Sequence, residues 1–118
     1  FFSFSVLCEE GMADESHTIL LVQYNVQLGS RCYHDFEGRS LALDYLLGIY
    51  EKELKRLNPG SKSITYDIAD VHGYLDQLSD VACLEFDSSL GAYVPRRKPW
   101  LKDQLIKHLQ QQAEEDGE

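Results

Sequence analysis

Cys32 and His34 are the two residues of this chain whose types and spacing come nearest to a metal site or a catalytic pair. A structural zinc site needs four ligands with regular spacing. The other candidates lie on separate predicted elements: His17, His72, His108 and Cys83. A nucleophilic cysteine needs a base held beside it, and no nucleophile elbow marks one here. We therefore interpret both as ordinary strand residues, and expect no enzymatic activity, no metal and no other cofactor.

Three consecutive cations, Arg96, Arg97 and Lys98, come directly before a predicted helix whose first turn contains Trp100. Cations are disfavoured at a helix N-terminus, so an exposed loop screened by solvent is the plainest interpretation. The functional alternative is a docking patch for an acidic protein segment or for RNA phosphates. The net charge of −9 disfavours a phosphate backbone, so we favour the acidic segment and keep direct RNA binding as an alternative.

The elements that must position these residues begin with a strand around Thr18–Val22. This segment is a continuous apolar run, with Thr18, Leu20 and Val22 on one face and Ile19 and Leu21 on the other. One small domain can cover only one sheet face with its own helices. The second apolar face therefore predicts a partner, and a second copy of the chain is the simplest one.

The rest of the pattern predicts an α+β fold with a largely antiparallel sheet, in the element order ββααββα. We expect a strand over 31–37, helices over 39–57 and 68–78, a strand over 81–86, a return strand over 92–94 ended by Pro95, and a last helix from Lys98. Asp67 and Asp70 suit a helix N-cap better than acid–base chemistry. Among seven tyrosines, Tyr33 and Tyr93 lie on short strands and are interface candidates, because a tyrosine is apolar with a polar tip.

The length of 118 residues and the hydrophobic content of 43% suit a single folded domain. We place this domain at residues 12–113, with an acidic, disordered tail over 114–118. Residues 1–11 precede Met12, a plausible start, and are interpreted as a leader, a vector-derived sequence or a flexible or tethered extension; an extra strand is the alternative. Three widely spaced cysteines fit reduced thiols rather than a disulfide framework. The apolar run 1–8 is too short to span a membrane.

Three segments carry a resemblance to the enhancer of rudimentary homologue family. They read SHTILLVQ at 16–23, LKRLNP at 54–59 and SITYDI at 63–68, and Tyr93-Val94-Pro95 and Trp100 also match. The resemblance runs from about Ser16 to Ala113 and needs no gaps. It implies a four-stranded antiparallel sheet with three helices on one face and a homodimer formed by the opposite face.

The resemblance also assigns residues and roles. It places Ile19 and Leu21 at the dimer interface, with His17, Arg31, Tyr33 and Tyr93 nearby. It implies a non-catalytic adaptor of the nucleus and cytoplasm that binds short segments of RNA-processing proteins, contacts RNA indirectly if at all, and acts in mRNA and small-RNA processing, gene expression, the cell cycle and pyrimidine metabolism. It implies no membrane partner.

Four positions depart from the family pattern. Cys32 and Gly38 stand where many animal members carry a phosphorylatable threonine and serine, which puts regulation by phosphorylation at these sites in doubt. Arg96 stands where an aromatic residue is common, and Pro99 where an acidic one is common. We therefore expect a divergent partner-binding surface.

Overall fold

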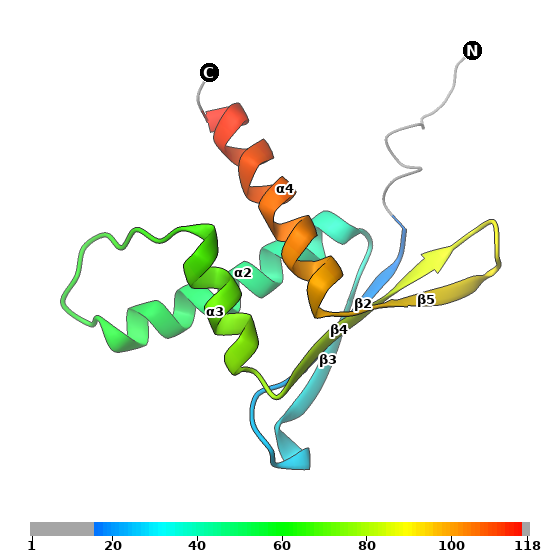
Figure 1. The fold of residues 1–118 in the computed structure, drawn as a ribbon, viewed down its shortest axis with the longest axis horizontal. Helices are drawn as coiled ribbons and strands as arrows, with labels where there is room; N and C mark the ends of the chain where they lie inside the picture. Colours follow the sequence, from blue (N-terminus) through cyan, green and yellow to red (C-terminus); the bar gives the residue numbers. More distant parts are fainter. Residues whose placement is uncertain (1–15, 117–118) are drawn as a thin grey trace.

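The computed structural model describes residues 16–116, and its four strands and three helices form an α+β fold (Figure 1). The expected order ββααββα is confirmed, apart from one short 3-10 turn, η1. The elements are β2 (Thr18–Gln23), η1 (Leu28–Ser30), β3 (Arg31–Phe36), α2 (Arg39–Leu57), α3 (Ile68–Gln77), β4 (Asp80–Asp87), β5 (Ala92–Arg96) and α4 (Lys98–Asp116). The predictions for residues 1–11 lie outside the described residues.

The sheet is antiparallel throughout, with the strand order β3-β2-β4-β5. Strand β2 is central: Leu20 stands opposite His34 of β3 on one side and Cys83 of β4 on the other. Strands β3 and β5 are the two edges. This arrangement makes alternate residues of β2 and β4 the middle of each sheet face.

The three helices cover one face of the sheet, which we call the inner face (Figure 1). Leu20 and Val22 of β2 are 0% and 2% exposed there. They pack in one core with buried side chains of the other elements, among them Leu46 of α2, Leu75 of α3 and Leu105 of α4. Burial of this kind is the main stabilising contribution in a domain of this size.

Local signals set where the helices begin and end. Asp67 caps α3: its carboxylate accepts a hydrogen bond from the Asp70 N–H at 3.0 Å, and the Asp70 carboxylate accepts one from the Asp67 N–H, also at 3.0 Å. This reciprocal capping box confirms the predicted N-cap. Helix α2 ends before Asn58, whose N–H and side-chain amide both donate to the Leu54 carbonyl.

Two elements extend further than predicted. Strand β5 continues through Pro95 to Arg96, so the prediction that Pro95 ends it is wrong. Because β5 is an edge strand, a proline that lacks an N–H is tolerated. Helix α4 continues to Asp116, so the backbone is helical at positions 114–116 of the segment expected to be a disordered tail.

Candidate interaction surfaces

The sheet face opposite the helices, which we call the outer face, is largely apolar. Ile19 and Leu21 of β2 stand opposite Leu84 and Ala82 of β4. On the far side of β4, Leu84 stands opposite Pro95 and Phe86 opposite Tyr93. On the other side of β2, Leu21 stands opposite Tyr33. The apolar positions therefore run across all four strands.

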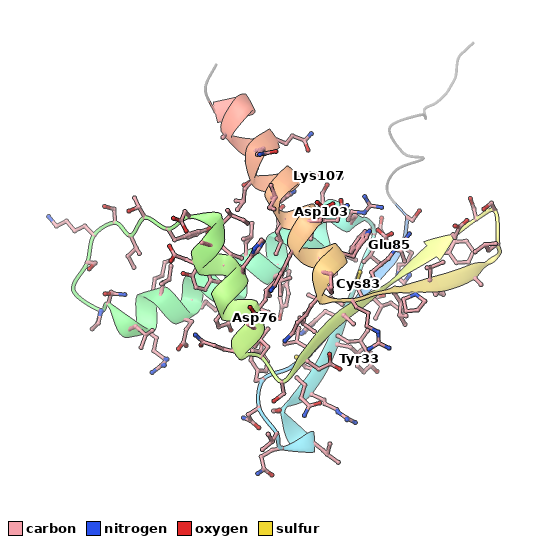
Figure 2. All side chains as sticks on the ribbon, in the orientation of Figure 1. Tyr33, Asp76, Cys83, Glu85, Asp103 and Lys107 are labelled. Carbon is pink, nitrogen blue, oxygen red and sulfur yellow. The ribbon has the colours of Figure 1, made fainter. Side chains whose placement is uncertain are left out.

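The exposure of these side chains separates the two faces sharply. Leu21 is 39% exposed, Tyr93 42% and Tyr33 73%, whereas Leu20 on the same strand is 0% exposed. Tyr33, labelled in Figure 2, lies within the edge strand β3. Ile19, Leu84 and Phe86 are only partly buried. Contiguous apolar surface of this kind marks an interaction site more often than a solvated face.

Polar groups border the outer face at both ends. His17 bridges two strands, with its Nδ1 2.7 Å from the Tyr93 hydroxyl and its Nε2 3.2 Å from an Asp35 carboxylate oxygen. At the opposite end, Arg31 donates from Nε to the Gln23 side-chain oxygen at 3.0 Å. These residues form a polar rim around an apolar centre, the usual anatomy of a protein interface.

The structure brings together all six residues that the sequence analysis assigned to an interface. His17, Ile19, Leu21, Arg31, Tyr33 and Tyr93 share the outer face. The sequence analysis missed Ala82, Leu84 and Phe86 of β4 and Pro95 of β5. Alternation along the predicted strand 81–86 is the signal that identifies the three residues of β4, whereas Pro95 lies beyond the predicted end of its strand.

The cluster Arg96, Arg97, Lys98 and Trp100 is arranged differently from a free docking patch. Lys98 donates from Nζ to the Leu78 carbonyl at 3.1 Å, at the C-terminal end of α3. Arg96 donates from Nε to Glu85 at 3.3 Å, and its guanidinium carbon lies 5.2 Å from the centre of the Trp100 ring. Two of the three cations are therefore bound within the chain, and Arg97 is the exposed one.

Glu85 organises this region. Its side chain is 7% exposed and lies on β4, near the first turn of α4 (Figure 2). Arg39 of α2 donates to both of its carboxylate oxygens, at 2.5 and 3.2 Å, and also donates to Gln104 of α4 at 3.2 Å. The Arg39 guanidinium lies over the Trp100 ring as well, at 4.9 Å. One buried carboxylate thus joins β4, β5, α2 and α4, a function the sequence analysis did not find.

The two residues of the C-x-H pair contact side chains of the same chain. The His34 Nε2 lies 3.0 Å from the Tyr45 hydroxyl, and Cys32 packs at the edge of the core. Within residues 16–116, no three histidine, cysteine, aspartate or glutamate side chains are arranged to hold a metal ion. None of the helices in this range is both long enough and apolar enough to cross a membrane.

Comparison with known proteins gives one consistent family. The family model described as "ER: Enhancer of rudimentary" matches residues 14–115. A protein named enhancer of rudimentary homolog from Echinococcus multilocularis is 44% identical over 99 residues, covering 83% of this chain and 97% of the relative. The Dictyostelium discoideum homolog is 39% identical over 99 residues (84% and 99%), and protein enhancer of rudimentary from Drosophila virilis is 40% identical over 98 residues (83% and 94%). The family match covers all four strands, α2, α3 and α4 as far as residue 115.

Proposed function

The chain belongs to the enhancer of rudimentary family, and on that premise we propose that it is a non-catalytic homodimeric adaptor. The dimer forms through the outer sheet face. It binds short segments of RNA-processing proteins and acts in mRNA and small-RNA processing in the nucleus and cytoplasm, with effects on gene expression, the cell cycle and pyrimidine metabolism. The family is named for enhancer of rudimentary and not for an enzymatic reaction.

One observation carries the dimer: a polar-rimmed apolar face stands open in the monomer. Leu21, at the centre of β2, is 39% exposed although its strand neighbours Leu20 and Val22 are buried. Covering apolar area stabilises an interface by roughly 25 cal/mol for each Å². A twofold axis lets the same face serve as both halves of the interface.

Dimerisation supports the adaptor role because it doubles any docking site on the helix side of the fold. Two equivalent sites bind two partner segments at once, and linked partners then bind with increased avidity. The tyrosines at the outer face fit this use, since tyrosine is enriched in protein interfaces.

Sedimentation analysis of the Leu21→Arg variant tests the dimer. We expect the wild-type chain to sediment at about 27 kDa, twice the 13.5 kDa of one chain, and the variant at the monomer mass. Leu57→Arg is the matched control, because Leu57 is 59% exposed at the end of α2 and away from the sheet. A wild-type monomer at micromolar concentration, or a Leu21→Arg variant that stays dimeric, contradicts the proposal.

A further inference from the structure

A groove of about 530 Å³ lies on the helix side of the fold, where a dimer of outer faces leaves it open. Three tyrosines from different parts of the chain line it: Tyr24 follows β2, Tyr45 lies on α2 and Tyr74 on α3. The rest of the wall comes from α2: Gly48, Ile49, Lys52, Glu53 and Arg56. We call this surface the tyrosine groove.

Gly48 is unexplained by packing within the chain. It lies in the middle of α2, where a glycine costs roughly 1 kcal/mol relative to alanine. A Cβ atom built at Gly48 meets nothing within 4 Å, so no close helix crossing requires a glycine there. The missing side chain instead leaves the helix backbone open at the wall of the groove. A backbone left open in this way suits close approach by another molecule.

The groove offers tyrosine hydroxyl groups that can donate hydrogen bonds to a ligand. Partial burial raises the pKa of the Tyr24 hydroxyl to about 12, and the nearby Cys32 acts in the same direction. Burial, together with the Glu53 carboxylate, raises the pKa of Tyr74. Both hydroxyls therefore stay protonated at neutral pH and can donate a hydrogen bond.

The charged groups at the rim of the groove also favour a ligand that carries hydrogen-bond acceptors. Glu53 is held by Arg56, which donates to its two carboxylate oxygens at 2.9 and 2.7 Å. Lys52 is exposed, and within residues 16–116 it forms no ion pair. A ligand that brings acceptors, and above all carboxylates, complements Lys52 and the tyrosine hydroxyls.

We propose that the tyrosine groove binds a short apolar segment of a partner protein that also carries acidic side chains. The inference rests on the adaptor function and moves the docking site from Arg96–Trp100, where Arg96 and Lys98 are already bound, to the junction of α2 and α3. The apolar side chains of the segment pack between the tyrosine rings and against the backbone at Gly48. Its carboxylates meet Lys52.

The test selects ligands for the full chain from a displayed library of random peptides of about twelve residues, with counter-selection against the Gly48→Leu variant. A Cβ atom at this position meets nothing within 4 Å, so we expect a leucine side chain to extend into the groove, and leucine favours the helix. Gly73→Leu is the matched control, because Gly73 lies in α3, outside the tyrosine groove, and also has open space at its Cβ position. Circular dichroism and sedimentation of both variants check the fold and the dimer.

We expect the selected peptides to combine leucine, isoleucine or aromatic residues with aspartate or glutamate. Their synthetic versions should bind Gly48→Leu at least tenfold more weakly than the wild type and Gly73→Leu as well as the wild type. Lys52→Glu should weaken the acidic peptides by roughly threefold to tenfold, in keeping with a partly exposed charge pair.

Three results overturn the inference. The selection yields no peptides that prefer the wild type to Gly48→Leu, the selected peptides are basic, or they bind Gly48→Leu and Gly73→Leu equally well. Preferential binding of single-stranded oligouridylate to the groove, lost in Gly48→Leu, replaces the protein segment with RNA and also overturns it. If the wild type is a dimer but selects no peptides, the proposal for the groove is contradicted and the proposal for the dimer is not. A monomeric wild type that still binds acidic peptides contradicts the dimer and leaves the groove standing.

Discussion

The two faces of the sheet are formed by the same strands, but one face is buried by the helices and the other is exposed. Along β2, Leu20 and Val22 point to the inner face and are closed off by three helices, whereas Ile19 and Leu21 point to the outer face and stay accessible. Along β4, Val81 and Cys83 are buried while Ala82 and Leu84 are only partly so. Neighbouring residues of similar hydrophobicity therefore differ in whether the chain itself covers them.

This difference separates what folds the monomer from what remains for binding. The inner face obtains its stability within one chain, and the buried carboxylate of Glu85 is neutralised there by two arginines. The outer face has an apolar centre and polar groups only at its ends. A surface built in this way contributes most to stability when a second surface covers it.

The largest expected effect on the free energy of unfolding comes from a substitution at the inner face. Leu20→Ala should lower the free energy of unfolding by about 3 kcal/mol, because Leu20 is fully buried and its truncation leaves a cavity. Leu21→Ala, one residue along, should cost less than about 1 kcal/mol. Urea denaturation measures both in the Ile19→Arg background, which we expect to be monomeric, so that dimer dissociation does not enter. Equal losses for the two variants contradict the distinction between the faces.

The buried carboxylate should show the next largest effect. Glu85→Ala should lower the free energy of unfolding by about 2 kcal/mol, because it leaves Arg39 and Arg96 without their acceptor. The loss is moderate because both guanidinium groups are about a third exposed and regain water. Asp103→Ala is the control: its exposed pair with Lys107, 3.2 Å apart on α4, should contribute less than about 0.5 kcal/mol (Figure 2). Similar losses in thermal or urea unfolding contradict the importance of the buried cluster.

Features fixed by local sequence were predicted well. The bounds of α2 at Arg39 and Leu57 agree with the sequence, as do the Asp67 cap and the two faces of β2. Each depends on residues within a few positions of one another, such as the turn at 58–60 after α2. The local period also has a limit: Leu57 continues the apolar pattern of α2 but is 59% exposed, since the final turn extends beyond the core.

Features that join distant residues were not predicted. The cluster of Glu85, Arg39, Arg96 and Trp100 connects four elements, and Arg39 and Glu85 lie 46 residues apart. In the sequence, Arg96 and Lys98 look like part of a run of free cations. The sequence does not show which carboxylate or carbonyl the fold brings to them. The candidate surface was predicted in part: β2 was assigned correctly to two faces, while the outer residues of β4 were left unassigned.

One such unassigned residue sharpens the comparison at the outer face. Leu84→Arg should weaken the proposed dimer at least tenfold, or about 1.4 kcal/mol, because Leu84 stands between Ile19 and Pro95 at the centre of the face. Leu90→Arg is the control, since Leu90 is 68% exposed in the turn between β4 and β5. Sedimentation over a dilution series measures both. If Leu84→Arg dimerises as tightly as Leu90→Arg, the interface does not include β4.

Labelling of the cysteines perturbs the protein least. The labelling rate of a thiol reports on solvent access to the inner face without an amino-acid substitution. Cys83 lies at the centre of that face and is 1% exposed, whereas Cys32 is half-buried on the edge strand β3. Burial raises the pKa of the Cys83 thiol to about 12, and the Glu85 carboxylate acts in the same direction. The thiolate is the reactive form, so Cys83 should react with iodoacetamide at pH 8 at least about a hundredfold more slowly than Cys32.

Peptide mass spectrometry distinguishes the two sites, and the same reaction in urea is the control, since both thiols then meet the same solvent. Because its pKa is raised, Cys83 should remain largely protonated up to pH 10, and its native labelling rate should rise about tenfold for each pH unit without reaching a plateau. A plateau near pH 9, or native rates as similar as those in urea, would mean that solvent reaches the middle of the inner face. The inner and outer faces would then differ only in degree, and the exposure of the outer face would no longer single it out as the dimer interface.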